Sequence, residues 1–202
     1  MVELENKYKL GVRRFGFINW VGAYSLYKKE VLRFLIVSGQ TLLGPILTSI
    51  LFLVVISLAI GDERSDVLGV PYIEFLANGL IMMQVIQQSF SHSSSSLMMS
   101  KMMGTIVDIV NSPLSAAEVT ISLVLASITR GICIASISTF IFIIFLDFSI
   151  QNYFLWFLYL LLAGFFLGSA GIIAGLYADK FDQMATVTNF VIVPLSFLSG
   201  TF

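Results

Sequence analysis

The chain has 202 residues, of which 57% are hydrophobic and 11% are charged, and its mean hydropathy is +0.94. A soluble domain carries roughly 25% charged residues because its surface faces water, so this composition predicts a membrane protein. The net charge of −1 argues against a nucleic-acid partner, and one cysteine and one histidine argue against an internal disulfide and the commoner zinc sites.

A polar and basic N-terminal region precedes every long apolar run. We expect residues 1–16 to form a cytoplasmic tail and residues 17–37 to form an amphipathic helix along the membrane interface. In that helix the bases Lys28, Lys29 and Arg33 occupy other faces than a set of apolar and aromatic side chains at helical spacing. That set is Trp20, Tyr24, Tyr27, Val31 and Leu35. The alternative is that residues 17–37 extend the first span into the cytoplasm.

Five apolar runs follow, and a spanning helix needs about 20 mostly apolar residues. The runs cover about 39–60, 72–92, 117–146, 152–177 and 185 onward, with a polar connector at about 93–114. We therefore predict an all-α membrane protein, a polytopic helical bundle whose transmembrane domain covers residues 38–202. Because the fifth run stops at Phe202 within apolar sequence, we expect this domain to be truncated and to lack its C-terminal part.

The distribution of basic residues predicts the orientation in the membrane. Seven lysines and arginines precede the first span, whereas the loop at 61–71 has only Arg64 among three acids. The N-terminus and the loops at 93–114 and 178–184 are therefore expected on the cytoplasmic side.

Polar side chains gather on one face of the second run, where an unsatisfied amide in hydrocarbon would cost several kcal/mol. This face is either a wall of a polar translocation path or a set of interhelical hydrogen bonds. Its members are Gln84, Gln87, Gln88, Ser91 and Ser95, with Asn78 further toward the start of the run.

Arg130 lies well inside the third run, so its guanidinium must face protein, water or headgroups. A functional pairing within the translocation path is one interpretation. We favour a structural role, for which snorkelling toward the cytoplasmic interface is one route.

The fourth run contains two pairs of glycines four residues apart, a spacing that permits close helix approach. The pairs are Gly164 with Gly168 and Gly171 with Gly175. Ser169 lies among them, and an intramembrane serine protease using Ser169 and His92 is a remote alternative because no third catalytic group is evident.

The sequence contains no glycine-rich phosphate loop ending in Lys-Ser or Lys-Thr. We therefore expect no catalytic, metal or cofactor site on this chain. If ATP powers transport, a separate chain must bind it. Internal symmetry and midplane ionisable residues, which would favour a secondary transporter, are not evident apart from Arg130.

From about residue 20 onward the chain resembles the ABC-2-type permease family, and bacterial inner-membrane exporter permeases of the multidrug or polysaccharide kind in particular. The resemblance depends on the order and spacing of several stretches. These are Phe75–Met83, Lys101, Val110–Glu118, Arg130–Gly131, Ala178–Asp182 and Pro194–Phe202.

The resemblance implies a six-span permease subunit that pairs as a dimer, a homodimer here, and docks cytoplasmic ABC ATPase subunits that carry the ATP. It implies that residues 93–114 form the loop that couples to the ATPase, and that residues 17–37 form the family's connecting helix. We predict a short cytoplasmic helix at about 100–112 within that loop. The expected coupling residues are Lys101, Thr105, Ile106, Asp108, Ile109, Pro113 and Glu118.

The resulting hypothesis is the permease subunit of an ATP-driven exporter for a drug, lipid or glycan, in a bacterial inner membrane. The expected partners are the ATPase, a second permease subunit and the lipid bilayer. The candidate path residues are Asn78, Gln84, Gln87, Gln88, Ser91 and Arg130. Two rival functions are a non-transporting membrane assembly subunit and an intramembrane enzyme.

Overall fold

The structure, a computed structural model, describes residues 18–60, 67, 69–146, 150 and 152–198. The predicted tail at 1–16 lies outside the described residues. Within them, every regular element is a helix. The elements are α2 (Trp20–Ile36), the π-helical turn η2 (Gly39–Leu43), α3 (Gly44–Ile60), α4 (Tyr72–Met102), α5 (Ile106–Asn111), α6 (Ala116–Leu146), α7 (Tyr153–Tyr177), α8 (Phe181–Val187), the π-helical turn η4 (Thr188–Ile192) and α9 (Val193–Phe197).

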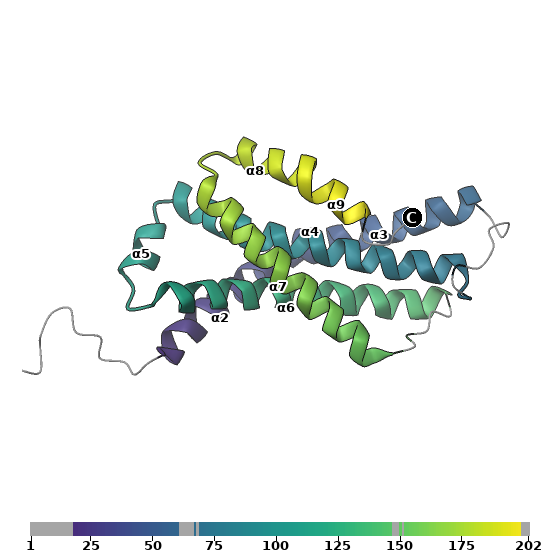
Figure 1. Cartoon of the computed structure of the whole chain (residues 1–202), viewed down its shortest axis with the longest axis horizontal. Coiled ribbons are helices and arrows are strands. Elements are labelled where there is room, and N and C mark those ends of the chain that lie inside the picture. The colour runs from purple at the N-terminus through teal and green to yellow at the C-terminus, as the bar shows by residue number, and fades with distance from the viewer. Residues whose placement is uncertain (1–17, 61–66, 68, 147–149, 151, 199–202) are drawn as a thin grey trace, which may run out of the picture.

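Helix α4 is the centre of the bundle. It packs against α6 and α7, and these two also pack against each other. Figure 1 shows α4 and α6 running along the long axis of the molecule while α7 crosses them diagonally. The largest apolar cluster, which includes Leu76, Leu80, Phe142 and Leu160, lies where the three helices meet.

Among the described residues, three helical segments are long and apolar enough to cross a membrane: Gly39–Ala59, α6 and α7. This agrees with the predicted all-α membrane protein. Helix α4 has 31 residues but carries a polar second half, and the last apolar run is divided into α8, η4 and α9. The prediction of five spans therefore stays a prediction.

Helix α4 extends ten residues beyond the end expected from the sequence. Residues 93–102 were predicted to begin a polar connector, and this is wrong because they continue the helix. The buried hydroxyls of Ser93 and Ser100 donate to the carbonyls of Ser89 and Ser96, at 3.3 and 2.9 Å. Such bonds satisfy a serine within its own helix, so a serine-rich sequence can stay helical when its neighbours bury it.

Helix α2 follows an N-cap at Asn19, whose side-chain oxygen accepts from the Gly22 amide at 3.0 Å. Its buried face carries Leu26, Glu30 and Phe34. Trp20 and Tyr24 are exposed on the remaining surface, where a helix along the interface would present aromatic side chains to headgroups.

Candidate functional site

The candidate site is the elbow where α4 turns into α6. The chain leaves α4 at Met102, turns at Gly104 with φ of +73°, forms α5 and passes Pro113 before α6 begins. The positive φ is a conformation that glycine adopts without strain. Figure 1 shows α5 at one end of the molecule, near the turn between α7 and α8.

Helix α5 exposes apolar surface. None of its residues is buried, and Val110 is 75% exposed. The exposed side chains of Met102 and Met103 adjoin it. The predicted helix at 100–112 is thus the last turn of α4, a three-residue break and α5.

The predicted coupling residues divide into two groups. Thr105, Asp108 and Pro113 are exposed, and Ile106 and Ile109 are half-buried. Lys101 instead turns toward α7, where its ammonium group donates to the carbonyls of Leu176 and of Ala178, the latter at 3.0 Å. Lys101 therefore supplies a cation and donors at the C-terminus of α7, where the helix dipole favours them.

Glu118 is only 6% exposed and faces inward. Its carboxylate accepts a hydrogen bond from the backbone amide of Ser115 at 2.7 Å, and the Ser115 hydroxyl accepts one from the backbone amide of Glu118 at 3.3 Å. This reciprocal pair is a capping box at the start of α6. The second carboxylate oxygen accepts a hydrogen bond from the backbone amide of Asn19 at 2.6 Å, so Glu118 also joins α6 to the start of α2.

A cavity of about 630 Å³ lies inside the elbow. Side chains of α2, of the last turns of α4 and of α5 line it, among them Ser25, Lys29, Ser100 and Asp108. The volume falls in the range of ligand pockets, about 300–1,000 Å³. Here the cavity means that α5 does not pack closely against α2.

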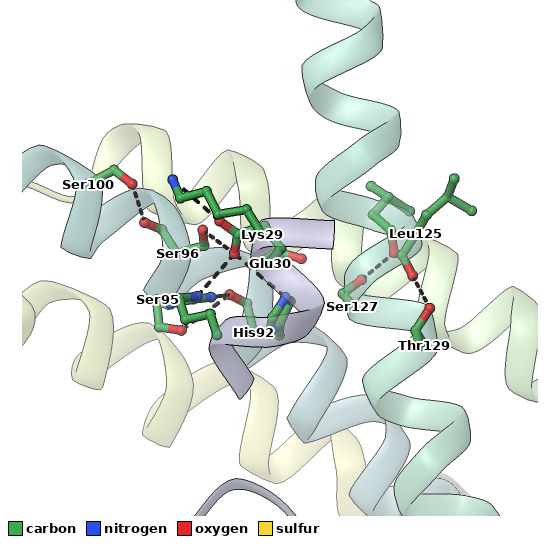
Figure 2. A network of polar contacts seen from close by, with 12 residues as sticks. Lys29, Glu30, His92, Ser95, Ser96, Ser100, Leu125, Ser127 and Thr129 are labelled. Carbon is green, nitrogen blue, oxygen red and sulfur yellow. Dashed lines mark hydrogen bonds and ion pairs between the residues drawn. The ribbon is translucent and has the colours of Figure 1, made fainter. Parts of the chain in front are cut away.

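A buried ionic cluster joins the middle of α2 to α4 (Figure 2). Glu30 is 1% exposed, and one of its oxygens lies 3.0 Å from Arg33 Nε and 2.8 Å from the Ser96 hydroxyl that donates to it. His92 Nε2 is 3.8 Å from the same oxygen, and Arg33 also donates to the His92 carbonyl at 3.2 Å. The ring of Phe34 packs edge-on against that of His92.

The polar face of α4 makes contacts on two sides. Gln88 accepts a hydrogen bond from Arg130 on α6, and Arg130 also donates to the Thr41 carbonyl at 3.3 Å. Gln87 donates to the hydroxyl of Ser196 on α9 at 2.8 Å. Arg130 is 8% exposed, so in this structure its guanidinium contacts protein groups.

The other candidate path residues are placed separately. Gln84 is buried, Ser91 is half-buried, and Asn78 is exposed beside a cavity of about 250 Å³ between α4 and α7. The structure brings Gln88 and Arg130 together, but no contact links them to Asn78 within the part of the chain that it describes.

The four glycines of α7 are buried and face α4 and α6. A Cβ atom on Gly171 would lie 2.5 Å from the Phe90 carbonyl oxygen, and one on Gly175 would lie 3.0 Å from that of Ser94. On α6, a Cβ on Gly164 would lie 3.1 Å from a side-chain carbon of Ile128, and one on Gly168 would clash with the Ser127 hydroxyl. Ser169 donates to its own helix at the Phe165 carbonyl, and His92 faces α2, which gives no support to a catalytic pair.

Sequence reasoning missed the Glu30 cluster and the Asn19 contacts. The available signal was an acid three residues before a base on the predicted interfacial helix, a spacing that places Glu30 beside Arg33. Nothing in the sequence showed that this pair would face the serine-rich end of α4.

The two glutamines give a prediction, since Arg130 is buried and Gln88 is its side-chain acceptor. We expect Gln88→Leu to lower the free energy of unfolding by about 1.5–3 kcal/mol, because a hydrogen bond to a charged group is lost. The control Gln87→Leu removes a neutral bond and should cost about 1 kcal/mol. Unfolding in mixed micelles measures both, and equal losses would contradict the role given to Gln88.

Known proteins provide an independent comparison. The sequence profile described as ABC-2 type transporter matches residues 22–202. The chain belongs to the ABC-2 type transporter family. It is 30% identical over 183 residues to the inner membrane transport permease YadH of Escherichia coli (strain K12), which covers 91% of this chain and 72% of that protein. YadH of Shigella flexneri matches to the same extent. No solved structure matches the chain.

Membership of the ABC-2 type transporter family and the apolar helices together identify a multi-pass membrane protein of the transport-permease type.

Proposed function

We propose that this chain is the permease subunit of an ATP-driven exporter in the inner membrane, and that α5 is its contact with a separate ATPase. The single observation that carries the proposal is α5 itself. It is a short helix with no buried residue and an exposed apolar surface, at the end of the molecule assigned to the cytoplasm. An exposed apolar patch on a helix that is not in lipid marks a protein interface.

The proposed partner carries the nucleotide site, and this chain carries no cofactor. A second permease subunit, in a homodimer, encloses the translocation path for a drug, lipid or glycan. In that assembly the polar face of α4 with Arg130 borders the path, because polar side chains within a membrane face protein or water in preference to lipid.

A photo-reactive amino acid at Thr105 tests the ATPase contact. Thr105 is exposed beside α5. In the intact chain co-expressed with its ATPase, we expect a crosslink from Thr105. The matched control is Tyr153, which is also exposed and is the first residue of α7, at the other end of the bundle. A crosslink from Tyr153 and none from Thr105 would overturn the coupling role and the proposed orientation.

A further inference from the structure

Helix α2 is attached at two places to the two helices that flank α5. Near its start, the Asn19 junction consists of Asn19, Gly22, Ala23, Pro113, Glu118 and Ser122. Besides the bond from the Asn19 amide to Glu118, the Asn19 side chain donates to the Pro113 carbonyl at 3.3 Å. The Ser122 hydroxyl shares its proton between the Glu118 carbonyl of its own helix at 2.7 Å and the Ala23 carbonyl of α2 at 3.0 Å. This junction holds α2 to the start of α6.

The second attachment lies about three turns further along α2. The Glu30 junction consists of Glu30, Arg33, His92 and Ser96 and holds α2 to the last third of α4. The two helices on either side of α5, α4 and α6, are thus joined through α2, on the side of the elbow that faces the cavity.

Helix α5 has few contacts of its own that would fix its position. It buries no residue, and the cavity of about 630 Å³ separates it from α2. Its position therefore depends on where its two ends are held. Those ends are Gly104, after α4, and Pro113, before α6, and the two junctions hold the helices next to them.

The Asn19 junction is well suited to holding a fixed geometry. Each of its three bonds between α2 and the start of α6 has a backbone group on one side, so only one partner per bond can change rotamer: the backbone groups are the Asn19 amide, the Pro113 carbonyl and the Ala23 carbonyl. The absence of a side chain at Gly22 also lets the α2 backbone lie close to Leu114, in the segment between α5 and α6. A Cβ on Gly22 would lie 2.7 Å from a methyl carbon of Leu114. A displacement of Pro113 and the start of α6 that left α2 in place would break these hydrogen bonds.

We infer that Glu118 is a positioning residue that acts through α2: it ties the interfacial helix to the elbow, so that α2, α5 and the start of α6 move as one unit. This inference gives the acid at the start of α6 an intramolecular partner, in place of direct contact with an ATPase. It rests on the proposed function only where it concerns transport. The attachment itself is a property of the isolated permease.

The isolated permease tests the attachment. Spin labels at Lys28→Cys on α2 and Val110→Cys on α5, both exposed, report the distance between these helices in a Cys133→Ser background. In nanodiscs we expect one narrow distance distribution for the unchanged chain. Glu118→Ala should add a second peak at another distance, with more than about 10% of the molecules. Glu118→Gln keeps one acceptor oxygen, so its second peak should be smaller.

Two further variants keep the test decisive. Asn19→Asp keeps the cap on the Gly22 amide but loses the donor to Pro113 and places a like charge beside Glu118, so it should also add the second population. Glu74→Gln removes a carboxylate from the first turn of α4, at its other end, and should leave the distribution unchanged. If Glu118→Ala and Asn19→Asp both fold and both keep the single narrow distribution, the inference is wrong.

The complete transporter gives a second readout. With the ATPase present, Glu118→Ala should leave the amount of permease needed for half-maximal ATPase stimulation unchanged and lower the maximal stimulation roughly fivefold or more. If Glu118→Ala instead needed more permease for half-maximal stimulation and still reached full maximal stimulation, Glu118 would contribute to docking only, and the inference would be overturned. Absence of any crosslink from Thr105 would instead remove the proposed function and leave the spin-label result standing.

Discussion

Replacing Gly171 by valine should lower the free energy of unfolding by about 3 kcal/mol, the upper end of the usual cost of overpacking. The new Cβ would lie 2.5 Å from the Phe90 carbonyl oxygen and 3.1 Å from Ser93 Cβ. The oxygen that would clash belongs to the backbone of the central helix α4, so no change of side-chain rotamer relieves the contact. The helices must separate along the face where α7 packs on α4, and the contacts on both sides of Gly171 weaken together.

Unfolding in mixed micelles measures this loss, and the matched control is Gly39→Val. A Cβ on Gly39 would have no atom within 4 Å, so the same substitution should change stability by less than about 1 kcal/mol. Gly171→Ala should fall between the two, since it adds only the clashing Cβ. If Gly171→Val and Gly39→Val were equally stable, the close approach of α7 to α4 would be refuted.

Replacing Glu30 by leucine should lower the free energy of unfolding by about 1–3 kcal/mol. Removing one partner of a buried ion pair costs roughly 3–5 kcal/mol because the other charge is left uncompensated. Arg33 is 34% exposed, so solvent screens part of this cost and the lower range applies. Ser96 also loses its acceptor.

A double substitution separates the charge from the packing. Glu30→Leu with Arg33→Leu removes both members of the pair, so it should be more stable than Glu30→Leu alone. Lys29→Ala is the control for charge near the cluster, because Lys29 is 55% exposed and 4.0 Å from Glu30 and should cost less than about 1 kcal/mol. Additive losses for Glu30 and Arg33 would contradict the pairing.

Much of the bundle could be predicted because hydropathy alone specifies long apolar helices. The runs that became α3, α6 and α7 were located from their length and composition, and the glycines of α7 from their spacing of four. The end of α4 could not be located this way. Its serines look like a loop in sequence, and they are helical because α2, α6 and α7 bury them, which is a property of the tertiary fold.

The candidate site was predictable only in part. Pro113 and the apolar residues around it indicated a break and a short helix, and the structure has α5 there. The inward directions of Lys101 and Glu118 could not be inferred, because each depends on a carbonyl or amide from a helix 75 or more residues away. Sequence spacing does not report which distant backbone groups lack a partner.

The polarity of α4 has a consequence for biosynthesis. The second half of α4 carries buried serines, and two charged residues of other helices, Glu30 of α2 and Arg130 of α6, contact it. The two helices that cover α4 most fully, α6 and α7, are translated after it. A polar helix is a poor substrate for direct release from the translocon into lipid. We therefore expect α4 to stay beside the translocon until about residue 177 has emerged, and to enter the bilayer together with α6 and α7.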